Sequence, residues 1–141
     1  MADTVEFELV SPEKLLLSEP VAMVVVPGSE GNFGVLPGHT PLISTVRPGL
    51  IDVYATDPNT ITDRIFVAGG FAEVTGERVT VLAEEAVPLK DLDRGAIETQ
   101  VRNLTDDVRD AKTDEVRGAA EAKLAIAQAK LDAISWATTG R

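Results

Sequence analysis

The pattern of apolar and polar residues changes near Pro88. Before it, apolar residues form short segments that either alternate with polar residues, as at 5–9, or run together, as at 21–26. Alternation is typical of a half-buried strand, and a short apolar run is typical of a strand buried on both faces. Further strands are expected at residues 42–46, 50–54, 61–67, 71–74 and 79–82. With Gly, Pro, Asn and Asp between them, these segments predict a β-sandwich or a flattened barrel.

After Pro88 the helix-favouring residues Ala, Glu, Asp, Lys and Arg dominate, and proline is absent. We expect Asp91 to cap a first helix, whose apolar stripe is formed by Ile97, Val101, Leu104 and Val108. We expect Thr113 or Asp114 to cap a second helix that ends near Trp136. Its apolar face would consist of Ala120, Leu124, Ala127, Leu131 and Ile134. Two helices with so short a break between them indicate an antiparallel hairpin.

The chain is therefore predicted to be α+β, with a β-sandwich domain at residues 1–87 and an α-helical hairpin domain at residues 88–141. The facing positions of the two helices are mostly alanine and single aliphatic residues. A buried methylene contributes about 0.8 kcal/mol, so we expect the hairpin to dock with only a few kcal/mol. Moving an equilibrium between a docked and an open hairpin from 1:99 to 99:1 would need ~5.5 kcal/mol, which is close to that docking energy. Two alternatives stay open, a static hairpin and one that a partner opens.

The net charge of −10 is concentrated in the first part of the chain, where residues 1–90 carry 13 acidic and five basic side chains. An acidic chain without a basic patch argues against a nucleic-acid partner. It also argues against direct binding to anionic lipid. No apolar run approaches the ~20 residues of a membrane span, so we expect no insertion into lipid.

The residue types that carry common catalytic chemistry are scarce. His39 is the single histidine and cysteine is absent, which argues against a catalytic triad and a histidine or thiolate metal site. His39 lies in a Pro-Gly-rich turn, where we expect its ring to bond to nearby backbone. The glycines do not match a phosphate-binding loop, because no lysine follows them at the required spacing. The sequence thus favours a protein-binding module over an enzyme, with no metal and no cofactor.

The order of the glycine motifs is informative. A Gly-Ser-Glu-Gly loop at 28–31 precedes GVLPGHTPL at 34–42, and GGFAEV at 69–74 precedes VTVLA at 79–83 and the alanine-rich helices. Over essentially its whole length, the chain resembles the ε subunit of bacterial F-type ATP synthase, which is equivalent to the mitochondrial δ subunit. The resemblance implies a ten-stranded β-sandwich followed by a C-terminal helical hairpin.

The resemblance also implies a function. In this family the subunit is part of the rotating central stalk, links the γ subunit to the c-ring and couples proton flow to ATP synthesis. The loop Ser29, Glu30, Gly31 and Asn32 would face the c-ring, with the turn around His39 and Pro41 at the same end of the sandwich. The hairpin would touch the α/β catalytic head transiently and regulate ATP hydrolysis. The subunit would be a peripheral protein on the cytoplasmic side of the bacterial inner membrane.

A nucleotide motif of the family is incomplete here. Some bacterial members bind ATP at the start of the first helix, where this chain has Asp93 and Arg94 but carries Ala96 at the position of the family's arginine. Arg94 is roughly 200° around the helix from that position, and the missing guanidinium removes a bidentate phosphate donor. Asp93 would then be only a helix-start residue.

The alternatives to a stalk subunit are an ATP-sensing regulatory module and a free-standing β-sandwich that binds proteins.

Overall fold

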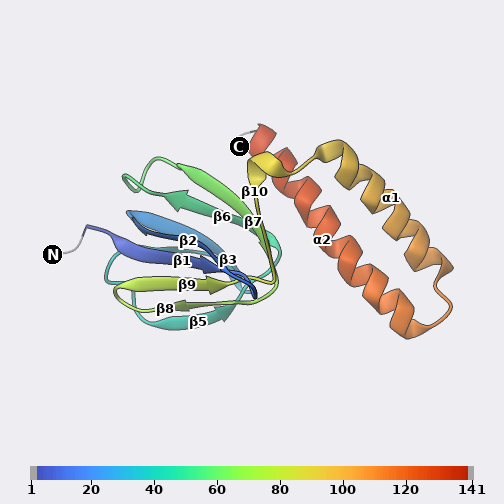
Figure 1. The fold of residues 1–141 in the computed structure, drawn as a ribbon, viewed down its shortest axis with the longest axis horizontal. Coiled ribbons are helices and arrows are strands. Elements are labelled where there is room, and N and C mark those ends of the chain that lie inside the picture. The colour runs from blue at the N-terminus through green and yellow to red at the C-terminus, as the bar shows by residue number, and fades with distance from the viewer. Residues whose placement is uncertain (1–2, 140–141) are drawn as a thin grey trace. The chain divides into compact units, whose positions relative to one another are not determined.

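The computed structural model describes residues 3–139 and divides the chain into two compact units, one ending at Pro88 and one beginning at Leu89 (Figure 1). The first unit is all β. Its strands are β1 (Val5–Val10), β2 (Leu15–Val21), β3 (Met23–Gly28), β4 (Gly31–Val35), β5 (Leu42–Thr45), β6 (Gly49–Tyr54), β7 (Asp63–Ala68), β8 (Phe71–Val74), β9 (Arg78–Leu82) and β10 (Glu85–Pro88).

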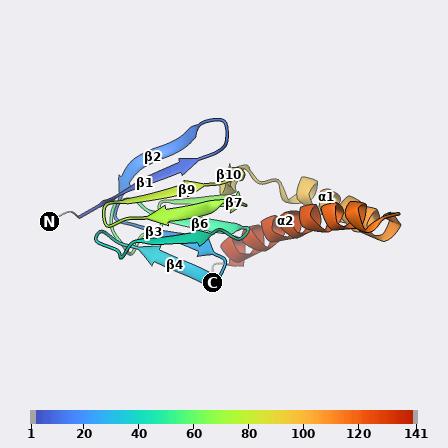
Figure 2. The same cartoon turned by 90° about the horizontal axis from the view of Figure 1, so that it is seen from below.

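The ten strands form two five-stranded sheets, which confirms the predicted sandwich. One sheet has the order β2-β1-β9-β8-β5 and the other has the order β10-β7-β6-β3-β4. In Figure 2 the layer with β1 and β2 lies on one side and the layer with β3 and β4 lies on the other. All pairs are antiparallel except β1 with β9, which brings the start of the chain beside residues some 70 positions later.

The core between the sheets follows the alternation seen in the sequence. In β1, Val5, Phe7 and Leu9 are buried while the residues between them are partly exposed. The largest fully buried side chains of this core are Phe7, Leu9 and Ile51, accompanied by valines. The inward positions of both sheets are thus filled by aliphatic and aromatic side chains, which fixes the register of each strand.

Three strands were not predicted from the pattern of residues. β2 contains Ser18, Glu19 and Pro20, and β4 begins with Gly31 in a glycine-rich segment. β10 is short and only half-buried. β2, β4 and β10 are all edge strands, where one backbone edge is unpaired and proline and polar residues are tolerated.

The second unit consists of a short 3₁₀ turn (Leu89–Asp91), α1 (Arg94–Asp110) and α2 (Asp114–Thr139). The expected cap at Asp91 is wrong, because Asp91 lies in the 3₁₀ turn and Asp93 caps α1. Thr113 caps α2, since its Oγ1 accepts a hydrogen bond from the Val116 amide at 3.1 Å. The helices pack antiparallel along much of their length (Figure 1), as predicted.

Candidate interaction surface

The loop expected to face a partner forms the end of the β3–β4 hairpin. We call residues 29–32 the tip. Gly28 and Gly31 are opposite each other in the ladder, and Ser29 and Glu30 make the turn between them. All four tip residues are exposed. Gly31 has φ +131°, a conformation that favours glycine, and no atom lies within 4 Å of where its Cβ would be.

The tip is exposed and yet held by hydrogen bonds from residues 45–47, the end of β5 and the two residues after it. Thr45 accepts the Ser29 amide at its carbonyl oxygen (3.0 Å), and its hydroxyl donates to the Ser29 hydroxyl (2.7 Å). The Arg47 amide donates to the carbonyl oxygen of Pro27 (2.9 Å). This segment therefore acts as a third strand beside the hairpin and fixes the shape of the tip.

The Arg47 guanidinium adds two short hydrogen bonds. Its Nη1 donates to the Gly28 carbonyl oxygen and its Nη2 donates to Asn32 Oδ1, each at 2.6 Å. Asn32, which the sequence assigned to the partner-facing loop, is thus also an internal contact of the hairpin. Arg47 was not among the residues predicted from the sequence, and its position next to Pro48-Gly49 is its only local signal.

A glycine pair closes the same end of the sandwich. The Val46 amide donates to the Gly70 carbonyl oxygen (3.1 Å), and the Ala83 amide donates to that of Val10 (2.9 Å). Gly70 has φ +97°, and a Cβ there would lie 1.7 Å from the carbonyl oxygen of Leu82. Only glycine fits this crossing of two backbone segments.

His39 lies at the opposite end of the sandwich from the tip, so the expectation that they share one end is wrong. β4 connects the two sites, and its five residues span roughly 16 Å at 3.3 Å each. Gly38, next to His39, donates its amide to the Gly76 carbonyl oxygen (2.8 Å), in the turn between β8 and β9. The His39 Nδ1 bonds to the Thr40 carbonyl oxygen (2.6 Å), as expected of a turn residue.

An apolar row that the sequence analysis missed crosses the outer face of the β1 sheet. We define it as Leu15, Val10, Leu82 and Phe71, which are successive cross-strand neighbours and end at Thr45, beside the tip. Leu15 is 56% exposed, Phe71 42% and Leu82 37%. Val10, Leu82 and Phe71 each follow or precede a core residue along the chain (Leu9, Val81 and Ala72). The available signal was therefore an apolar residue at an outward position of the alternation.

The residues of the incomplete nucleotide motif are at the start of α1. Asp93 Oδ1 accepts a hydrogen bond from the Ala96 amide (3.3 Å), the usual contact of an N-cap. Arg94 and Ala96 are both exposed. The Asp93 carboxylate therefore has a structural role in the helix, as the simpler interpretation of the sequence proposed.

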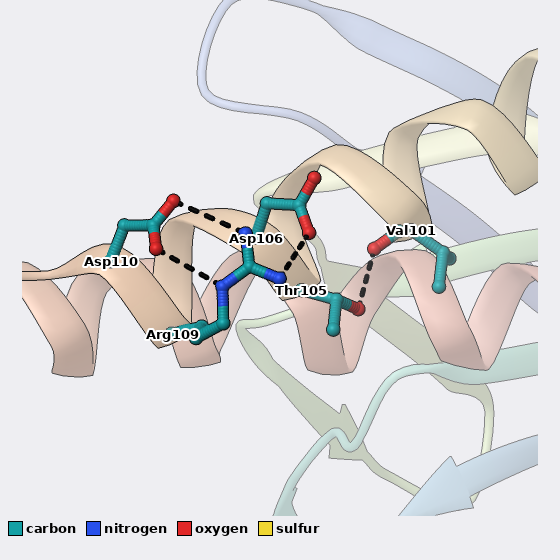
Figure 3. A network of polar contacts seen from close by, with 5 residues as sticks. All are labelled: Val101, Thr105, Asp106, Arg109 and Asp110. Atoms are coloured by element: carbon teal, nitrogen blue, oxygen red, sulfur yellow. Dashed lines mark hydrogen bonds and ion pairs between the residues drawn. The ribbon is translucent and has the colours of Figure 1, made fainter.

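The C-terminal turn of α1 carries a small charge network (Figure 3). Arg109 contacts Asp110 at 3.0 Å and Asp106 at 3.2 Å, while the Thr105 hydroxyl donates to the Val101 carbonyl oxygen. The hydrogen bond from Arg109, followed by its positive charge, lowers the pKa of Asp110 below its ordinary value. The same contacts raise the pKa of Arg109. A cation at a helix C-terminus also interacts favourably with the helix dipole there.

Among residues 3–139 there is no group of three or more His, Asp or Glu side chains that could hold a metal ion. Neither α1 nor α2, over the residues described, is long and apolar enough to cross a membrane.

Comparison with known families identifies both units. Residues 4–89 match the family model of the ATP synthase delta/epsilon chain β-sandwich domain. Residues 93–140 match the family model of the C-terminal domain of the ATP synthase epsilon chain. Together the two models extend over nearly the whole sequence.

Individual relatives agree with the family models. The ATP synthase epsilon chain of Rhodospirillum centenum is 62% identical over 138 residues, covering 96% of this chain and 94% of the relative. That of Rhodospirillum rubrum is 52% identical, covering 94% and 98%. A chain in the mitochondrial ATP synthase of Euglena gracilis, solved with OSCP, F1 and the c-ring, matches with a TM-score of 0.79 and 26% identity, over 92% of this chain and 80% of that one.

Proposed function

This chain belongs to the family of ATP synthase ε chains, and on that premise we propose that its tip is the surface that faces the c-ring. The chain is a non-catalytic subunit of the central stalk of F-type ATP synthase, where it couples proton translocation to ATP synthesis. Its partners are therefore other ATP synthase subunits. Which of its surfaces meets which subunit is the subject of the proposal.

The observation that carries the proposal is that the tip is both exposed and held by hydrogen bonds. Ser29 is held by two hydrogen bonds to Thr45, and yet Ser29 and Glu30 are exposed. A contact that transmits torque must not yield under load, and an ordered polar loop meets that requirement better than a mobile one. The solved relative from Euglena gracilis was determined together with a c-ring.

The apolar row is proposed as the surface that meets the γ subunit. Exposed apolar side chains that are contiguous across a sheet mark protein interaction sites. The row adjoins Thr45 and hence the tip, so one end of the sandwich would meet γ and the c-ring together. Such an arrangement links the two partners through rigid β structure.

The hairpin is proposed to make only a transient, weakly regulatory contact with the α/β head. Of the cations on α2, Arg117 already binds Asp114 at 2.8 Å and the Ala111 carbonyl oxygen. The four acidic residues of α2 (Asp114, Glu115, Glu121 and Asp132) outnumber its three basic residues (Arg117, Lys123 and Lys130). We expect ATP binding to be weak or absent, because Asp93 caps α1 and Ala96 offers no phosphate donor. Within the complex, the subunit would lie peripherally on the cytoplasmic face of the bacterial inner membrane.

Site-specific cross-linking tests the proposal directly, because the sequence has no cysteine and each introduced one is unique. Glu30→Cys, carrying a short photoactivatable cross-linker, should give an adduct with the c subunit in the assembled complex. Phe71→Cys should give an adduct with γ. His39→Cys is the matched control at the opposite end and should give no adduct with the c subunit. Adducts of the c subunit with position 39 and not with position 30 would refute the assignment.

A further inference from the structure

Arg47 makes the shortest hydrogen bonds at the tip, although it has no part in the proposed docking surface. Within residues 3–139 no carboxylate forms an ion pair with it. Its guanidinium instead donates to the Gly28 carbonyl oxygen and to Asn32 Oδ1, both at 2.6 Å. A cation whose hydrogen bonds all go to neutral acceptors of one hairpin is more than a solvated surface charge.

The position of these bonds explains why they are needed. β3 pairs with β6 only at residues 23–25, and the remaining extension of the β3–β4 hairpin bonds instead to the residues around the end of β5, where Gly28 bridges to Val46. Arg47 binds this extension at three points, Pro27 through its amide and Gly28 and Asn32 through its side chain. Since Gly28 is on β3 and Asn32 on β4, the guanidinium links both strands of the hairpin.

We propose that Arg47 is a positioning residue, which holds the tip in the shape that docks onto the c-ring. This inference rests on the proposed function of the tip. The planar guanidinium presents several donors in a fixed geometry and reaches two acceptors at once. A lysine would keep the charge but, as a single point donor, would not hold both strands equally well.

We call the hydrogen bonds from the Arg47 guanidinium to Gly28 and Asn32 the brace. Hydrogen exchange on the isolated protein tests the brace without any partner. In Arg47→Gln we expect the amides of residues 29–32 to exchange about tenfold faster, as the loss of a charge-assisted hydrogen bond implies. In Arg47→Lys the exchange rate of these amides should lie between that of the unchanged protein and that of Arg47→Gln. Arg102→Gln is the matched control, because Arg102 donates to Thr99 within α1. Unchanged exchange at the tip in Arg47→Gln would overturn the inference.

The assembled complex tests whether the brace serves docking. In Arg47→Gln we expect less proton pumping per ATP hydrolysed in inverted membrane vesicles, with an unchanged unfolding midpoint of the isolated protein. A disulfide between Ser29→Cys and Thr45→Cys, whose hydroxyls lie 2.7 Å apart, should restore pumping in the Arg47→Gln background. Rescue supports positioning, since the disulfide replaces the restraint and not the guanidinium.

The outcomes separate this inference from the function on which it rests. Failure of the disulfide to rescue pumping, while Glu30→Cys still cross-links to the c subunit, would refute a positioning role and assign Arg47 to a direct contact. Faster exchange in Arg47→Gln without any c-subunit adduct at position 30 would confirm the brace and refute the docking surface. Lost pumping with a lowered unfolding midpoint would mean a general structural role and would also refute the inference.

Discussion

The sandwich and the helical hairpin bury apolar surface in different ways. In the main core of the sandwich the buried residues are valine, isoleucine, leucine and phenylalanine, apart from Ala72 and Ala83. Among the residues of the hairpin whose burial is described, three of the five buried apolar residues are alanines, and Ile97 and Leu104 are the larger two. The free energy of burial scales with apolar area, so each buried position of the hairpin contributes less.

This difference suggests a division of work within one small protein. A docking surface that carries torque needs a rigid support, and the two packed sheets supply it. The alanines buried in the hairpin contribute little apolar area, which suits the transient contact with the α/β head that we propose for it. We therefore expect damage to the sandwich to abolish function and damage to the hairpin to alter it.

The largest expected effect comes from truncating a core side chain in each region. Phe7→Ala should destabilise the sandwich by about 4 kcal/mol, because a fully buried aromatic ring leaves a cavity. Leu104→Ala should lower the stability of the hairpin alone, by about 2 kcal/mol, which is the low end of the range for buried Leu→Ala substitutions. Denaturant unfolding with hydrogen exchange measures both. Two results would contradict the division between a rigid sandwich and a weakly packed hairpin. One is an equal loss of unfolding free energy in both variants, and the other is a loss of hydrogen-exchange protection in the sandwich of Leu104→Ala.

Replacing a glycine by alanine should change stability in opposite directions in the two regions. Gly70→Ala should destabilise the sandwich by about 3 kcal/mol, since its φ is positive and its Cβ would meet the Leu82 carbonyl. Gly118→Ala should stabilise α2 by up to about 1 kcal/mol, because alanine favours helix and its Cβ enters open space. Thermal unfolding of the two variants tests the contrast, and a tolerated Gly70→Ala would show that the backbone crossing is not fixed.

Removing the cap of α1 should have a smaller effect. Asp93→Ala should cost about 1 kcal/mol, as expected for a lost N-cap. Asp91→Ala is the matched control and should change little, since Asp91 lies before the cap. The thermal unfolding of both variants would be followed by circular dichroism. A larger loss of stability in Asp91→Ala than in Asp93→Ala would show that Asp91 is the cap, as expected from the sequence.

The smallest expected effect is the pH dependence of the Arg109–Asp110 pair. The folded pKa of Asp110 is lowered, so its contribution is present above the unfolded pKa of about 3.9 and is lost as the pH falls through the folded value. Both side chains are exposed, so the change in stability should be slight. In an NMR titration, Arg109→Gln should raise the pKa of Asp110 toward its ordinary value. An unchanged titration would show that the pair does not form in solution.

The sequence predicted most of the fold because one periodicity governs each region. Alternation identifies β1, and helical spacing identifies the stripe that includes Ile97 and Leu104. The edge strand β4 was missed because Gly31 and Gly34 carry no strand signal of their own, and its pairing with β3 decides its conformation.

The site was less predictable for a related reason. The tip was found from its glycine motif, but the brace joins Arg47 to residues 19 and 15 positions earlier in the sequence. No local pattern reports such contacts. The placement of His39 at the opposite end likewise follows from the direction of β4, which was not among the predicted strands.

Matched charge reversals in the two regions test the central claim most directly. Glu30→Lys changes the exposed turn of the tip, and Glu121→Lys makes the same change at an exposed position of α2. Both complexes would be assayed for proton pumping per ATP hydrolysed in inverted membrane vesicles. We predict that Glu30→Lys lowers this ratio and that Glu121→Lys leaves it unchanged. Normal coupling in Glu30→Lys, or an equal loss in both variants, would contradict the assignment of the c-ring contact to the tip of the sandwich.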